Sequence, residues 1–135
     1  GNGAGSSIAS HFANDLTNSS NYKVYSYDNS AQITCLSNDY KYSNWVKKII
    51  DFYVDKKDLI ILISASGESR NMIEAARFCR RKKLEFISLT GFNKKNSLNK
   101  LSKNFCWVDS TSYNYVELAQ LYILLSIVDN LSIKK

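Results

Sequence analysis

The sequence has 135 residues, of which 44% are hydrophobic and 22% are charged. These proportions exclude a disordered, fibrous or disulfide-stapled chain, and the length predicts a single domain over residues 1–135. The net charge of +6 is spread along the chain, and without a basic stripe or a known motif it is weak support for a nucleic-acid-binding protein. The longest basic run, residues 80–83, falls where a helix should end, and the helix dipole favours cations there.

The three cysteines, Cys35, Cys79 and Cys106, are an odd number and share no ligand-type spacing. This pattern argues against a disulfide framework and against a thiolate zinc site, and it favours the reducing cytoplasm. The apolar runs 59–63 and 121–128 are too short to cross a bilayer. We therefore expect a cytoplasmic protein whose partners include no membrane and no nucleic acid.

The chain opens with a glycine loop, residues 1–7, which leads into a helical segment at 8–16. Loops of this kind normally follow a buried strand, so we expect a strand or helix to precede residue 1 outside this sequence. A weak strand is predicted at 24–27, and apolar residues at helical spacing predict a helix over 43–53.

Strand and helix patterns continue to alternate in the second half. Residues 58–64 and 84–90 are the clearest strands, and the continuous apolar run of the first is typical of a strand buried on both faces. A helix is expected at 71–82, a weak strand at 105–108 and a long helix at 115–131, apolar around much of its circumference. This order predicts an α/β fold, a doubly wound parallel sheet sandwiched by helices in a flavodoxin-like three-layer arrangement.

A serine-rich segment joins the strand at 58–64 to the helix at 71–82. It reads Ser-Ala-Ser-Gly-Glu-Ser-Arg-Asn from Ser64 to Asn71, and residues 64–69 are called the serine loop below. Ligands of parallel sheets bind at the carboxyl ends of strands, where a helix start offers free N–H groups, and Ser64, Ser66 and Ser69 add hydroxyl groups. The loop thus predicts a phosphate site. The alternative is that Ser66 and Ser69 only cap the helix.

His11 and Asp15 stand four residues apart, on one face of the first helical segment. This spacing suits a metal pair or an acid/base pair, and an ordinary surface contact is the alternative. The glycine loop and the serine loop both open helices. They could line one anion site from two sides.

The sequence resembles the sugar isomerase (SIS) domain family, and within it the phosphoheptose isomerases, in four stretches: GNGAGSSIASHFANDL, LSNDYKYSNW, DLIILISASGESRNMIEAARF and LEFISLTGF. The resemblance implies isomerisation of sedoheptulose 7-phosphate to D-glycero-D-manno-heptose 7-phosphate, or of a related sugar phosphate, by a homodimer or homotetramer. It implies a set of substrate-binding residues, namely Asn2, Gly3, Ser6, Asp39, Ser64, Ser66, Ser69 and Asn71. His11 and Asp15 would be the catalytic residues, and they would also hold zinc if a metal binds.

The resemblance also shows departures from the family. The glutamine and the histidine of the family's last helix fall on Val116 and Leu124, which can neither bind a metal nor carry a proton. A one-turn shift of this helix would bring Glu117 or Gln120 to the pocket instead. Two functions therefore stay open: an isomerase, or a sugar-phosphate-binding or protein-interaction module that has lost the chemistry.

Overall fold

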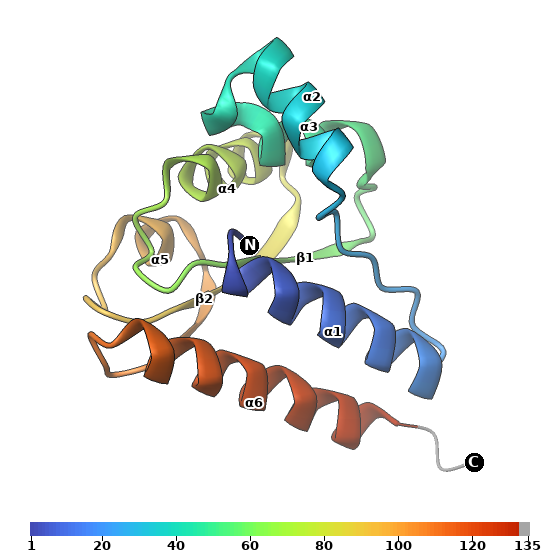
Figure 1. Ribbon diagram of the computed structural model, residues 1–135, viewed down its shortest axis with the longest axis vertical. Helices are drawn as coiled ribbons and strands as arrows, with labels where there is room; N and C mark the ends of the chain where they lie inside the picture. Colours follow the sequence, from blue (N-terminus) through green and yellow to red (C-terminus); the bar gives the residue numbers. More distant parts are fainter. Residues whose placement is uncertain (133–135) are drawn as a thin grey trace.

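A computed structural model of the chain describes residues 1–132 and shows a parallel sheet between two layers of helices (Figure 1). The elements in chain order are α1 (Ala4–Ser19), α2 (Ser30–Tyr40), the short 3-10 helix η1 (Tyr42–Asn44), α3 (Trp45–Tyr53), β1 (Leu59–Ile63), α4 (Arg70–Lys82), β2 (Glu85–Thr90), α5 (Ser97–Leu101), β3 (Asn104–Trp107) and α6 (Tyr113–Leu131). The α/β fold class predicted from the sequence is confirmed.

The sheet of the described residues has the strand order β1-β2-β3, and both strand pairs are parallel. Ile61 of β1 pairs with Ile87 of β2, and Leu89 of β2 pairs with Cys106 of β3. Parallel neighbours need crossovers, and α4 and α5 provide them. Helices on both faces explain why β1 is apolar throughout rather than alternating.

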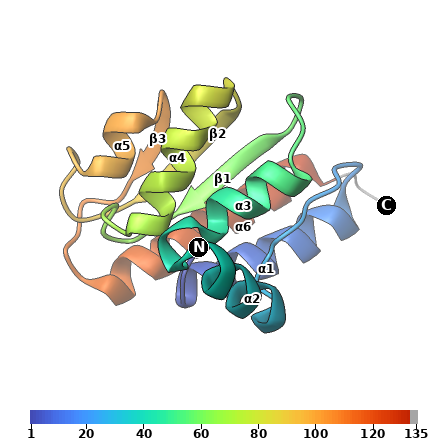
Figure 2. The same cartoon turned by 90° about the horizontal axis from the view of Figure 1, so that it is seen from above.

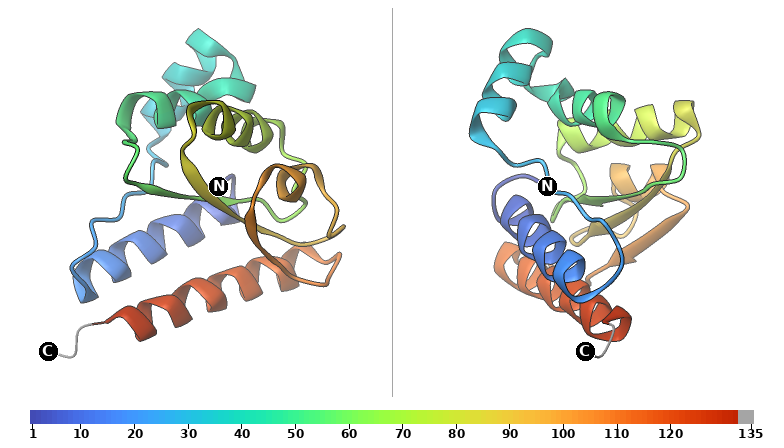
Figure 3. Two further views of the ribbon diagram at one scale, coloured as in Figure 1. Left: turned by 180° about the vertical axis from the view of Figure 1, so that it is seen from behind. Right: turned by 90° about the vertical axis from the view of Figure 1, so that its right-hand side faces the viewer.

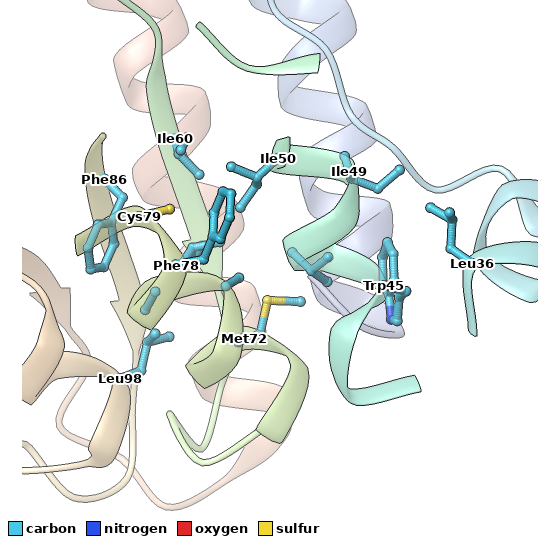
Figure 4. Packing of buried hydrophobic residues seen from close by; sticks show 14 residues of the cluster. Leu36, Trp45, Ile49, Ile50, Ile60, Met72, Phe78, Cys79, Phe86 and Leu98 are labelled. Carbon is cyan, nitrogen blue, oxygen red and sulfur yellow. The ribbon is translucent and has the colours of Figure 1, made fainter. Parts of the chain in front are cut away.

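The two faces of the sheet carry separate cores. Seen from above, α2, α3 and α4 lie in front of the sheet, with α1 and α6 on its far side (Figure 2). The front core joins α3 and α4 to β1 and β2, with Trp45, Ile49, Met72 and Phe78 among its members (Figure 4). On the other face α1 and α6 lie side by side (Figure 3).

Several boundaries differ from those expected. The first helix begins at Ala4, so much of the glycine loop is helical, and the helix expected at 43–53 is divided between η1 and α3. The strand expected at 24–27 is wrong, because this extended segment has no neighbour in the described sheet. Instead the backbone of Val24 is bonded to a side chain: its N–H donates to Thr17 Oγ1 at 3.0 Å, and its carbonyl accepts from that hydroxyl at 3.2 Å.

The basic run forms the end of a helix, as expected. Arg80, Arg81 and Lys82 occupy the last turn of α4, and Lys83 closes the helix in the left-handed conformation at φ 57°. Within residues 1–132 no helix combines the length and the apolar character needed to cross a membrane.

Candidate functional site

A cavity of about 130 Å³ lies at the carboxyl end of β1, where helices α1 and α6 also begin (Figure 1). It is lined by Asn2, Gly5, Ile63, Ser64, Ala65, Ser66, Ser69, Tyr113, Glu117 and Gln120. A single water needs only ~10–15 Å³, whereas pockets that enclose a drug-sized ligand measure ~300–1,000 Å³. The cavity therefore suits a small ligand, or one end of a longer one.

The serine loop forms one wall of this cavity. Ser64 follows β1 directly, and its N–H donates to Leu89 O at 3.0 Å, which holds the loop start on the sheet. Ser69 is the N-cap residue of α4, but its side chain makes no capping hydrogen bond. Instead it accepts from Ser64 Oγ at 3.3 Å, and Ser66 Oγ accepts from the N–H of Glu68 at 3.2 Å. Helix capping therefore does not account for the hydroxyl of Ser69.

Residues 96–98, at the start of α5, hold the serine loop in place. Gly67 has φ +69°, and a Cβ at this position would lie 2.1 Å from Cγ of Asn96, so only glycine fits. The carbonyl of Gly67 accepts from Leu98 N at 3.0 Å, and the Glu68 carboxylate accepts from Ser97 N at 2.8 Å. The hydrogen bonds from Ser97 hold the pKa of the Glu68 carboxyl below its ordinary value. The loop is therefore preformed.

The glycine loop meets the serine loop through two amides. Asn2 lines the cavity, and its side chain exchanges two hydrogen bonds with the buried side chain of Asn71. Gly3 is the N-cap of α1 at φ 50°, and its carbonyl accepts from Ser6 N at 2.9 Å. Gly3, Ser6 and Asn71 do not line the cavity. Residues of the glycine loop and of the serine loop therefore line the same cavity.

Helix α6 lines the cavity through Tyr113, Glu117 and Gln120. Gln120 is 1% exposed, and neither amide atom has a hydrogen-bond partner in the described chain. Within the described part of the chain, Glu117 is the one charged side chain that lines the cavity. Glu117 and Gln120 thus reach the cavity without any shift of the helix.

Val116 and Leu124 are both core residues. Val116 is fully buried, and its Cγ2 lies 2.4 Å from where a Cβ on Gly91 would stand. Leu124 packs in the second core with Phe12 and Ile63. Tyr113 was not expected from the sequence. The one sequence feature that could have indicated Tyr113 is its position at the start of the helix that follows the last predicted strand.

His11 and Asp15 lie outside the cavity. His11 Nε2 is 3.6 Å from Asp15 Oδ2, and the two side chains are 53% and 42% exposed. Asp39 is also exposed and accepts hydrogen bonds from Cys35 Sγ at 3.6 Å and from the Asn38 amide at 3.1 Å.

The described residues do not by themselves fit a zinc site. Zinc is held by three or four protein ligands, and no group of three or more His, Cys, Asp or Glu side chains within residues 1–132 is placed to hold a metal. His11 and Asp15 supply two ligands at most.

The fold and the cavity define an α/β domain with a candidate site at the carboxyl end of a parallel strand. A family model described as the SIS domain matches residues 47–123, which is more than half of the chain. The chain belongs to the SIS domain family.

The chain is also similar to curated phosphoheptose isomerases. It is 33% identical over 96 residues to that of Hamiltonella defensa, covering 67% of this chain and 47% of the relative. It is 32% identical over 96 residues to that of Cytophaga hutchinsonii, covering 67% of this chain and 50% of the relative. The chain thus spans about half the length of the curated relatives it matches.

Solved structures show the same fold. A phosphoheptose isomerase from Neisseria gonorrhoeae superimposes with a TM-score of 0.86 at 22% identity, over 97% of this chain and 72% of the other. The NanR protein of Vibrio vulnificus, solved in complex with ManNAc-6P, gives a TM-score of 0.66 at 18% identity, over 96% of this chain and 45% of that one. The fold is therefore shared with a protein that is not named as an isomerase.

Proposed function

We propose that the cavity binds a sugar phosphate and that the protein isomerises it between ketose and aldose forms, as a phosphoheptose-type isomerase. The observation that carries the proposal is the preformed serine loop, which opens into the cavity at the start of α4. The similarity to phosphoheptose isomerases supports the choice of substrate class. Sedoheptulose 7-phosphate is the first substrate to test.

Phosphate would be held here by neutral donors. No lysine or arginine among residues 1–132 lines the cavity. The hydroxyl groups of Ser64, Ser66 and Ser69 can each donate, and the first N–H groups of α4 have no partner within the helix. The positive end of the helix dipole adds a favourable field for an anion. Asn2, at the cavity wall, would contact the sugar, and Asp39 would need to approach it from α2.

Isomerisation moves a proton between two neighbouring carbons, which requires a base and an acid close to them. Two carboxylates compete for the role of base. Asp15, with His11 beside it, is favoured by the resemblance to the family, whereas Glu117 is favoured by its place in the cavity. Catalysis by the pair on α1 would require the reacting carbons to lie beyond the cavity mouth.

The alternative function is a sugar-phosphate-binding module without turnover. The observation in its favour is that Val116 and Leu124 are core residues, at positions where the resemblance places a glutamine and a histidine. A binding module of this kind would use the serine loop to bind the sugar phosphate and would not isomerise it.

Deuterium exchange separates the two functions. The protein is incubated with sedoheptulose 7-phosphate in deuterated water, with and without added zinc, and the sugar is followed by NMR. An isomerase incorporates deuterium next to the carbonyl and forms an aldose phosphate. Loss of exchange in Asp15→Asn or in Glu117→Gln identifies the base, while Asp51→Asn, an exposed carboxylate on α3, is the control. Ligand line-broadening without exchange supports the binding module, and no interaction contradicts both.

We also propose that the protein forms homodimers or homotetramers through α6. Tyr115, Leu118 and Tyr122 are all exposed, and the spacing of three and four residues places them on one helix face. An exposed apolar stripe of this kind is typical of a subunit interface.

A further inference from the structure

Gln120 is a buried polar residue with nothing in the structure to satisfy it. It lies in the middle of α6, is 1% exposed, and both Nε2 and Oε1 lack a hydrogen-bond partner within the described residues. Ser37 Oγ and Trp45 Nε1 are also unpartnered, but these residues do not line the cavity. Gln120 does line it, together with Ser64, Ser66 and Ser69 of the serine loop.

The buried residues around Gln120 on α6 are apolar, so burying its amide there costs free energy of folding. The buried stripe of α6 consists of Val116, Gln120, Leu124 and Val128, one residue per turn, and the other three are apolar. A buried amide that loses its hydrogen bonds to water costs about 1–3 kcal/mol for each unsatisfied group. Leucine or methionine would avoid this cost and complete the apolar stripe. A polar side chain at this position therefore needs a partner that the described chain does not provide.

We propose that Gln120 is a ligand-binding residue whose amide pairs with the hydroxyl-bearing carbon chain of a phosphorylated polyol or sugar. This inference rests on the proposed function, since it takes the phosphate end of the ligand to be in the serine loop. The amide offers both a donor and an acceptor, which matches a hydroxyl group that accepts one hydrogen bond and donates another.

The position of Gln120 in the cavity predicts which part of the ligand its amide contacts. The serine loop and α6 both line one cavity of about 130 Å³, so one small ligand can touch both. An anion in the serine loop is bound without Gln120, whereas the carbon chain beyond it reaches the amide. Gln120 therefore selects a sugar phosphate over inorganic phosphate.

The test compares two ligands on three proteins. Binding of inorganic phosphate and of sedoheptulose 7-phosphate is measured by calorimetry for the wild type, for Gln120→Leu and for Gln32→Leu. Gln32 is a half-buried glutamine on α2 that does not line the cavity, so the same side-chain change is made there away from the site. Gln120→Met, with a flexible side chain of similar length, serves as a second variant if the leucine does not pack.

We expect Gln120→Leu and Gln120→Met to bind the sugar phosphate about tenfold more weakly, the loss of one to two hydrogen bonds. Phosphate affinity should stay within twofold of the wild type, and the melting temperature without ligand should rise by ~2 °C or more. Gln32→Leu should change neither affinity. Equal sugar-phosphate affinity in the wild type and the Gln120 variants would overturn the inference alone. If the wild type binds neither ligand, the proposed function is wrong and the inference falls with it.

Discussion

Asn2 and Asn71 are 69 residues apart in sequence, yet their side-chain amides form a reciprocal pair: Asn2 Nδ2 donates to Asn71 Oδ1 at 3.0 Å, and Asn71 Nδ2 donates to Asn2 Oδ1 at 2.8 Å. The pair joins the glycine loop to the first turn of α4. Tyr42 OH adds a hydrogen bond to Asn2 Oδ1 at 3.4 Å. The pair therefore connects the two loops, which gives Asn71, a residue outside the cavity lining, a positioning role.

Replacing Asn71 should therefore weaken both the fold and the site. Asn71→Ala removes two hydrogen bonds from a residue that is 2% exposed, so we expect it to lower the free energy of unfolding by about 1–3 kcal/mol. Phosphate affinity should fall as well, because the hydrogen bonds that connect the glycine loop to the serine loop are lost. Urea unfolding and calorimetry measure the two effects. Asn38→Ala, at an exposed asparagine on α2, should stay within ~0.5 kcal/mol of wild type, and an equal loss in both variants would refute the positioning role.

The serine loop depends on glycine at position 67, and Gly3 offers a matched comparison. Both have a positive φ, +69° and +50°, but a Cβ on Gly67 would meet the Asn96 side chain at 2.1 Å, whereas one on Gly3 would have no atom within 4 Å. Both Gly→Ala variants carry the backbone strain, of about 1 kcal/mol or more. Gly67→Ala adds the clash, so it should unfold at lower urea and lose phosphate binding. Equal midpoints would show that the loop moves aside without cost.

The sequence predicted those parts of the fold that depend on local pattern. β1 and β2 were found because both are long apolar runs. Helix α2 was missed because Leu36 is its only buried residue, and α5 because five residues capped by Asn96 give no periodicity. The segment at 24–27 looked like a strand, but a strand exists only with a paired neighbour, and pairing is not local.

The same distinction holds for the site. The serine loop could be predicted because one strand and one helix position it. Which face of α6 meets the cavity depends on how that helix crosses the sheet. Tyr113 was therefore missed, and Glu117 and Gln120 entered only as alternatives to Val116 and Leu124. The exposure of His11 and Asp15 likewise depends on packing, since helical spacing places them together but does not say what they face.

The buried Cys79 thiol should make the protein less stable at high pH. Burial raises its pKa from 9.0 to about 11. The thiol therefore ionises more easily in the unfolded chain, so the free energy of unfolding should fall as the pH rises from about 9 towards about 11. Urea midpoints at pH 8 and pH 10.5 measure this loss. It should be smaller in Cys79→Ala than in the wild type or in Cys35→Ala, where an exposed thiol is removed. The same loss in all three proteins would assign the effect to other groups.

The exposed stripe of α6 predicts how assembly and the site are related. Tyr115, Leu118 and Tyr122 point away from the core, whereas Glu117 and Gln120 face the cavity on the same helix. Leu118→Glu with Tyr122→Glu places charges where a second copy would bury apolar surface, and it should convert oligomers to monomers in light scattering. His11→Gln changes an exposed side chain on α1 and is the control for surface change. A wild type that is already monomeric would contradict assembly through α6.

If the monomeric variant still binds inorganic phosphate like the wild type, each chain holds a complete serine-loop site. Lost binding would mean that the interface keeps α6 in place against the cavity.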